Sequence, residues 1–187
     1  MTTILVTGAT GTLGRQVSER LRTAGADVRG LSRRSPSYAV DLRDGKGLDA
    51  AVEGADAIVH CATTPRGGDD RAAGFLIDAA KLPVLPVPSG VRVQPVDSGE
   101  VADRLAALAL GGPAGRVPDL GGPEVREFTD LAGAFLRAGG RKRRVVPVRL
   151  AGRAYAGYRR GDHLAPGHAV GTVTFEEFLD RRHRHPA

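Results

Sequence analysis

The residues TILVTGATGTLGRQV, at positions 3–17, combine a short apolar run, a glycine-rich turn and the start of an amphipathic segment. The apolar run 4–6 lies between threonines and is followed by glycine, which is typical of a buried parallel strand. Apolar residues then recur every four positions, as on one face of a helix: Leu13, Val17 and Leu21. Gly25 is placed to end that helix. The opening therefore predicts a strand, a glycine turn and a helix.

The glycines of this turn, Gly8, Gly11 and Gly14, form a GxxGxxG pattern. Between a strand and a helix the pattern indicates a dinucleotide site. The first glycine permits a tight turn, the second lets the backbone approach a pyrophosphate, and the third lets helix and strand pack closely. The free N–H groups at the helix start then bind phosphate. The alternative interpretation is a glycine-rich turn that holds no ligand.

A second strand, predicted at 28–31, is followed by Ser32, Arg33 and Arg34. An NAD-binding chain usually has an acidic residue here, which binds the ribose 2′-hydroxyl. Two guanidinium groups and a hydroxyl suit a 2′-phosphate instead, because arginine donates paired hydrogen bonds to phosphate oxygens. We therefore predict NADP as the cofactor, with NAD as the alternative. The competing interpretation is that these arginines belong to the general arginine excess of the chain.

The rest of the chain predicts an incomplete α/β fold. A short helix at 48–52 and a strand at 57–61 extend the opening, and strands joined by helices form a parallel sheet with right-handed crossovers. A turn or two of helix is expected at 75–82, but a full strand–helix–strand unit needs about 30 residues and does not fit there. Later elements are predicted as strands at 91–96, 117–120 and 145–148 and as helices beginning at Ser98 and Thr129, with a capping box at Thr174 and Glu177. We expect a Rossmann-like doubly wound parallel sheet, shortened after about residue 65, as domain 1–112, and a small C-terminal α+β portion, 113–187, on the substrate side.

Several segments resemble the atypical short-chain dehydrogenases/reductases of the NmrA-like, NAD(P)-binding group: TGATGTLG (7–14), SRR (32–34), AVDLRD (39–44), IVHCATTP (58–65), VRVQPVDSGEVADRLAALAL (91–110) and LGGPEVREFTDLAGAFLRA (120–138). The resemblance implies where a dinucleotide would bind. The pyrophosphate would face Gly8, Ala9, Thr10, Gly11, Thr12 and Leu13, ahead of Gly14, and the 2′-phosphate would face Arg33 and Arg34 beside Ser32. Asp41 and Leu42 would contact the adenine, and Cys61, Ala62 and Thr63 the ribose and nicotinamide side. Cys61 can also be read as a small buried apolar residue.

The resemblance breaks at the proton donor. Most short-chain enzymes use a YxxxK dyad, but Tyr38, Tyr155 and Tyr158 have no lysine four residues later. Relatives also carry about two further strand–helix units after the strand that ends near Cys61, which implies an internal deletion here. Uncovered apolar edges would follow, and a homodimer could cover them. We assign no catalytic residue, and whether the chain is an enzyme stays open.

Two functions remain. The first is an NADP(H)-preferring protein of this oxidoreductase family, in which hydride transfer to a small carbonyl or quinone is in doubt. The second is a non-catalytic NAD(P)-sensing regulator that acts through protein partners.

Composition and charge bear on the protein's compartment and on what it can bind. A single cysteine excludes an intramolecular disulfide and favours a reducing cytoplasm. No apolar run reaches the about 18 residues of a membrane span, and the histidines lack zinc-site spacing. The net charge is +6, but the basic runs 141–144 and 181–184 have no interleaved aromatic residues. We therefore predict neither membrane, metal nor nucleic-acid binding.

Overall fold

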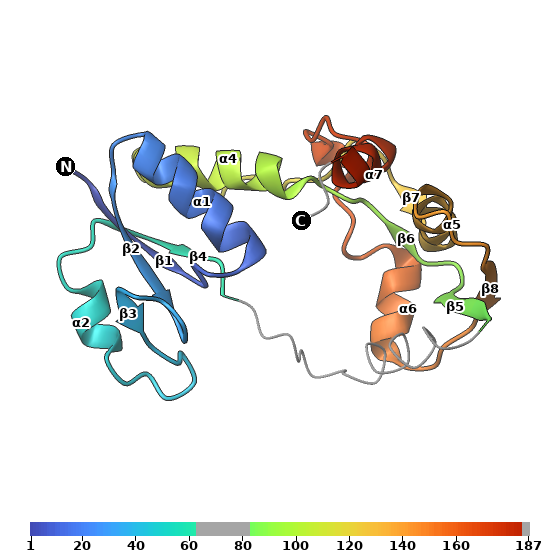
Figure 1. Cartoon of the computed structure of the whole chain (residues 1–187), viewed down its shortest axis with the longest axis horizontal. Helices are drawn as coiled ribbons and strands as arrows, with labels where there is room; N and C mark the ends of the chain where they lie inside the picture. Colours follow the sequence, from blue (N-terminus) through green and yellow to red (C-terminus); the bar gives the residue numbers. More distant parts are fainter. Residues whose placement is uncertain (63–82, 185–187) are drawn as a thin grey trace. The chain divides into compact units, whose positions relative to one another are not determined.

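The computed structural model describes residues 1–62 and 83–184. By its contacts the chain forms two compact units (Figure 1). The first contains described residues 1–62 and 98–117, and the second contains 83–97 and 118–184. Thr63 and the helix predicted at 75–82 lie outside the described residues. The division into folding domains 1–112 and 113–187 stays a prediction.

Four parallel strands form the sheet of the first unit, in the order β3-β2-β1-β4. They are β1 (Thr3–Thr7), β2 (Asp27–Ser32), β3 (Tyr38–Ala39) and β4 (Ala57–His60). The helices of this unit are α1 (Thr12–Thr23), α2 (Leu48–Val52) and α4 (Ser98–Leu110). This strand order is that of half a Rossmann sheet, so the predicted α/β fold is confirmed.

Strand β1 supplies the core on both faces of this sheet. Ile4 and Val6 pack in one buried cluster with side chains of α1, β4 and α4, namely Val17, Leu21, Val59, Ala102 and Ala106. Leu5 packs in a second cluster with Leu31, Val40 and Ala51. Alternate residues of a strand point to opposite faces. One run of three apolar residues therefore fixes α1 and α4 on one face and α2 on the other.

Helix α1 ends as its sequence predicts. Gly25 has φ +84°, and its N–H donates to the carbonyl of Arg22 at 2.9 Å. The next N–H, of Ala26, donates to the carbonyl of Leu21 at 3.0 Å. These two bonds form a Schellman motif, which requires a left-handed residue and therefore favours glycine.

Strand β4 leaves one large apolar side chain exposed. Ile58 is 54% exposed, although it pairs in register with the buried Leu5 of β1. The homodimer expected from an uncovered apolar face stays a prediction.

The second unit contains two small sheets. Strand β5 (Val84–Pro88) pairs in parallel with β8 (Arg144–Val148), and β6 (Arg92–Val93) pairs antiparallel with β7 (Arg126–Glu127). Its helices are α5 (Phe128–Ala138), α6 (Arg153–Arg160), α7 (Phe175–Arg184) and the 3₁₀ turn η1 (Pro166–His168). The capping box before α7 is confirmed, because the Glu177 N–H donates to Thr174 Oγ1 at 3.3 Å and the Thr174 N–H to Glu177 Oε2 at 2.8 Å.

Prolines explain where the strand predictions failed. The strand predicted at 91–96 contains only β6, since Pro95 has no N–H to donate, and the strand predicted at 117–120, which contains Pro118, is wrong. Conversely, β5 was not predicted because it contains Pro86 and Pro88. In a two-stranded sheet each strand is an edge, where proline is tolerated. Across the described residues, no helix combines the length and apolar character that crossing a bilayer requires.

Candidate functional site

Gly8 lies where the ends of three strands converge. Its φ is +68°, a conformation that residues with a side chain rarely adopt. Its N–H donates to the carbonyl of Leu31, at the end of β2, at 2.7 Å. A Cβ atom at this position would lie 2.7 Å from the backbone nitrogen of Ala62, just after β4. No other residue type fits this turn without displacing backbone.

Gly11 and Gly14 let α1 start directly against the turn. The Gly11 N–H donates to the Gly8 carbonyl at 2.9 Å, which closes the turn. A Cβ atom on Gly14 would collide with the same carbonyl oxygen and lie 2.7 Å from its carbon. The third glycine therefore has the helix-packing role that the pattern predicts.

At the N-terminus of α1, no described side chain caps the free N–H groups. Its N-cap is Gly11, which has no side chain to accept from the helix, and the first turn contains no acidic residue. The first helical bond runs from the Arg15 N–H to the Gly11 carbonyl, at 3.0 Å. The N–H groups of Thr12, Leu13 and Gly14 precede that bond and have no intrahelical acceptor. Such a helix end attracts an anion.

A hollow of about 580 Å³ opens beside this turn, at the carboxyl edge of the parallel sheet. It brings together ten of the predicted site residues: Gly8, Thr10, Gly11, Ser32, Arg33, Arg34, Asp41, Leu42, Cys61 and Ala62. Four others do not line it: Ala9, Thr12, Leu13 and Gly14. They lie within the turn or in the first turn of α1. Ligands of open parallel sheets bind at this carboxyl edge.

The hollow has four further lining residues that sequence reasoning missed: Leu31, Val40, Arg43 and His60. Leu31 and His60 belong to the carboxyl ends of β2 and β4. The rule that ligands bind at this edge would have been a sufficient signal for both. Val40 follows β3 directly, and its buried side chain belongs to the core, which gives it no separate signal.

Ser32 ties the glycine turn to the arginines. Its Oγ accepts from the Thr10 hydroxyl at 3.0 Å and from the Arg34 N–H at 3.2 Å. The hydroxyl thus fixes the backbone of the segment that carries both guanidinium groups.

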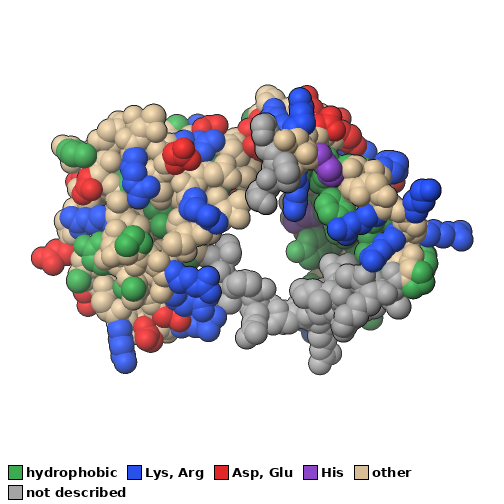
Figure 2. All heavy atoms as spheres, in the orientation of Figure 1, with side chains coloured by type: hydrophobic (Ala, Val, Ile, Leu, Met, Phe, Trp, Pro, Cys, Tyr) green, Lys and Arg blue, Asp and Glu red, His purple; other side chains and the backbone are tan. Residues whose placement is uncertain are grey.

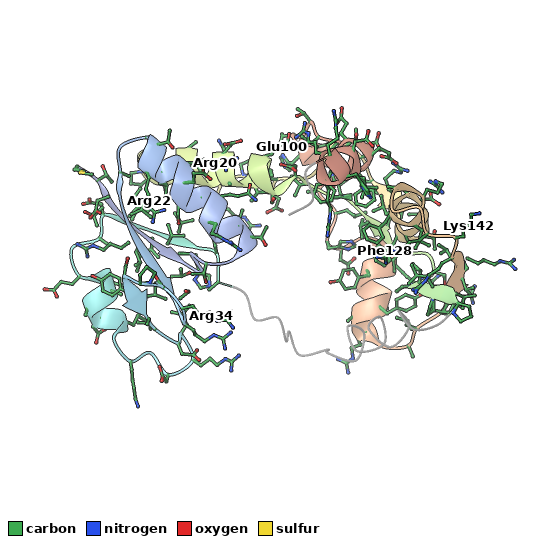
Figure 3. The ribbon with its side chains drawn as sticks, in the orientation of Figure 1. Arg20, Arg22, Arg34, Glu100, Phe128 and Lys142 are labelled. Atoms are coloured by element: carbon green, nitrogen blue, oxygen red, sulfur yellow. The ribbon has the colours of Figure 1, made fainter. Side chains whose placement is uncertain are left out.

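Three arginines give the hollow a positive charge. Arg33, Arg34 and Arg43 are exposed, and within residues 1–62 and 83–184 no ion pair or hydrogen bond engages their side chains. Figure 3 labels Arg34 beyond the end of β2, and Figure 2 shows basic side chains gathered at this part of the first unit. The carboxylate of Asp41, which also lines the hollow, accepts from the Arg43 N–H at 3.1 Å. The hollow is therefore suited to an anionic ligand.

Two of the lining residues, His60 and Cys61, lie at the end of β4 and directly after it. His60 Nδ1 lies 2.8 Å from the Thr7 hydroxyl, across the register that pairs these two residues. Burial raises the pKa of the Cys61 thiol above its ordinary value. The thiol is therefore protonated at neutral pH, and a thiol is a far weaker nucleophile than a thiolate.

None of the three tyrosines is among the described lining residues of this hollow. Tyr38 packs against the Leu5 cluster. The Tyr155 hydroxyl donates to the Ser89 carbonyl at 2.6 Å, and the Arg159 guanidinium lies 5.9 Å from the centre of its ring. Tyr158 makes an edge contact with the ring of His163 at 4.7 Å.

Part of the chain is similar in sequence to a known protein family. Residues 4–75 match the NAD dependent epimerase/dehydratase family. Uncharacterized proteins of Mycobacterium tuberculosis (strain ATCC 25618 / H37Rv) and Mycobacterium bovis are 40% identical over 76 residues, which cover 36% of this chain. The matched region is 9% of the length of those relatives.

Solved structures share the fold across nearly the whole chain. An NADPH-dependent quinone oxidoreductase of Escherichia coli, complexed with NADPH, has a TM-score of 0.62 at 16% identity, covering 95% of this chain and 99% of that one. The dTDP-4-dehydrorhamnose reductase of Bacillus anthracis, in complex with NADP, has a TM-score of 0.67 at 12% identity and covers 100% of both chains. These structures show that the chain shares their fold, and residues 4–75 are similar in sequence to the NAD dependent epimerase/dehydratase family.

Proposed function

We propose that the first unit binds NADP(H) and that the chain is an NmrA-like member of the atypical short-chain dehydrogenases/reductases. The observation that carries the proposal is the hollow at the carboxyl edge of the sheet. There an uncapped helix N-terminus and three arginine side chains surround one space.

The glycine turn fits a pyrophosphate. Gly8 and Gly11 line this part of the wall and have no side chains, so a ligand can approach their backbone closely. The N–H groups of Thr12 and Leu13 supply donors beside it, and the positive end of the helix dipole favours the negative charge.

The end of β2 fits a 2′-phosphate. Arg33 and Arg34 follow Ser32 directly, and their guanidinium groups are held by no carboxylate among the described residues. An NAD-specific site would need an acidic group at this place. Among the residues that the structure describes, Asp41 is the only acidic one on the lining, and it follows β3 rather than β2. We therefore propose a preference for NADP(H), with Asp41 and Leu42 on the adenine side.

The reaction class follows from the cofactor. When bound, NADP(H) would supply a hydride, and the chain would bind and orient the dinucleotide. Reduction of a small carbonyl or quinone is the class we propose, and a structural neighbour described as an NADPH-dependent quinone oxidoreductase supports it.

One observation favours the second function, a non-catalytic sensor that acts through protein partners. The Tyr155 hydroxyl is already bonded to the Ser89 carbonyl, and its neighbour at the YxxxK lysine position is Arg159. A phenol held in this way stabilises α6 rather than donating a proton.

Calorimetric titration with NADPH and with NADH tests the binding proposal. The variant Arg33→Ala/Arg34→Ala should bind NADPH about ten- to a hundredfold more weakly, because it loses charge-assisted hydrogen bonds, and should bind NADH almost unchanged. The matched control is Arg22→Ala/Arg104→Ala. It removes two exposed arginines from the same unit outside the hollow and should bind like the wild type. Equal loss in both double variants would refute the assigned 2′-phosphate site.

Loss of NADPH absorbance in the presence of quinones and aldehydes then separates the two functions. Turnover that is lost in the Arg33→Ala/Arg34→Ala variant identifies an oxidoreductase. Tight NADPH binding without turnover across the panel identifies a sensor.

A further inference from the structure

A second hollow, of about 470 Å³, lies in the second unit between α5, the start of β8 and the residues that join them. Four arginines line it: Arg126, Arg137, Arg141 and Arg143. All of its lining residues belong to the second unit, so it shares none with the dinucleotide hollow.

A glycine on α5, Gly133, lines this hollow. Thr129, Gly133 and Arg137 follow one another at intervals of four residues, so they lie along one face of the helix. A Cβ atom on Gly133 would lie 3.2 Å from Nη1 of Arg137. The guanidinium group is therefore folded back over the glycine, toward the hollow. A glycine inside a helix is less favourable than alanine, and the space that it leaves for Arg137 is a physical reason for its presence.

The charges around the hollow are not balanced. Arg126 is neutralised by Glu124 at 3.1 Å and by Glu176 at 3.2 Å. Within the described residues, neither the Arg137 nor the Arg141 side chain makes an ion pair or a hydrogen bond. Among the lining residues within 83–184, only Asp130 has a carboxylate. Guanidinium groups around one space repel one another, and an anion between them would remove that repulsion.

We propose that this hollow binds a small phosphorylated ligand. Guanidinium groups bind phosphate oxygens with paired hydrogen bonds, so the arginines of this lining suit such a ligand. Leu136 and Val145 add an apolar part to the wall, as in most small-molecule sites, and the volume lies in the range of such sites. Lys142, labelled in Figure 3, belongs to the same segment but does not line the hollow.

Residue-resolved NMR with inorganic pyrophosphate tests this proposal on the full chain. Pyrophosphate should shift the amide signals of Thr129, Gly133 and Arg141 with a saturating curve. The variant Arg137→Gln/Arg141→Gln should weaken that binding about tenfold or more, since two charge-assisted contacts are removed. The control Arg149→Gln/Arg153→Gln makes the same charge change at two exposed positions outside the hollow and should bind as the wild type does.

Signals of Gly8 to Gly14 report the dinucleotide site in the same spectra, so the two proposals succeed or fail separately. Non-saturating shifts of equal size in all three proteins would overturn the proposed phosphate site. A single-stranded oligonucleotide that moves the same amides and binds more tightly than pyrophosphate would also overturn it, in favour of nucleic acid.

Discussion

The close contact between Gly14 and Gly8 makes Gly14→Ala a demanding test of the fold at the proposed cofactor site. The new Cβ atom would collide with the Gly8 carbonyl oxygen and lie 2.7 Å from its carbon and 2.9 Å from the Cα of Ala9. All three are backbone atoms, so α1 or the turn itself must move. Overpacking of this kind costs about 1–3 kcal/mol. The rigid obstacle puts Gly14→Ala at the upper end.

The helix propensity of alanine offsets part of that cost, by about 1 kcal/mol. A net loss of about 2 kcal/mol corresponds to roughly thirtyfold faster amide hydrogen exchange in α1, if exchange follows the opening equilibrium. Exchange followed by mass spectrometry on peptides from α1 and α5 measures each unit separately.

Gly133→Ala is the matched control, because it makes the same change inside α5. Its Cβ atom meets only the end of the Arg137 side chain, which can swing away. Exchange in α5 should therefore slow by a few-fold, for a gain of about 0.5–1 kcal/mol. If Gly14→Ala leaves exchange in α1 unchanged or slower, the argument from backbone contact is wrong.

Three further predictions concern single residues. Thr7→Val removes the hydroxyl bonded to His60 and should lower the free energy of unfolding in urea by about 1 kcal/mol; no change would show that the bond contributes nothing. Cys61 should react with iodoacetamide at a higher pH than free cysteine, because burial raises its pKa; its contribution to stability is complete below the unfolded pKa and is lost as pH rises through the folded value. A reactivity midpoint at or below that of free cysteine would contradict this. Thr174→Ala removes the hydroxyl that accepts from the Glu177 N–H and should cost about 1 kcal/mol, seen as faster exchange in α7 alone.

The first unit could be predicted because its signals are local. A strand, a glycine turn and a helix follow one another within residues 3–25, and each glycine has a task that neighbouring atoms explain. The arginines after β2 were found for the same reason. Arg43 was missed because no motif marks it, whereas His60 ends a strand at the carboxyl edge, where the rule for open parallel sheets would have found it.

The second unit was harder to predict because its strands depend on partners far along the chain. Strand β5 pairs with β8, some sixty residues away, and its prolines argue against a strand until that edge pairing is known. The second hollow is likewise lined by residues from one face of α5 and from the later strand β8. The basic run 141–144 alone predicts only a solvated loop.

The central claim is that the first unit binds a dinucleotide and prefers the phosphorylated one. Calorimetric titration of the unmodified chain with NADPH and NADH tests it most directly. We expect one saturable site that binds NADPH more tightly than NADH. A folded protein that gives no binding heat with either nucleotide would contradict it.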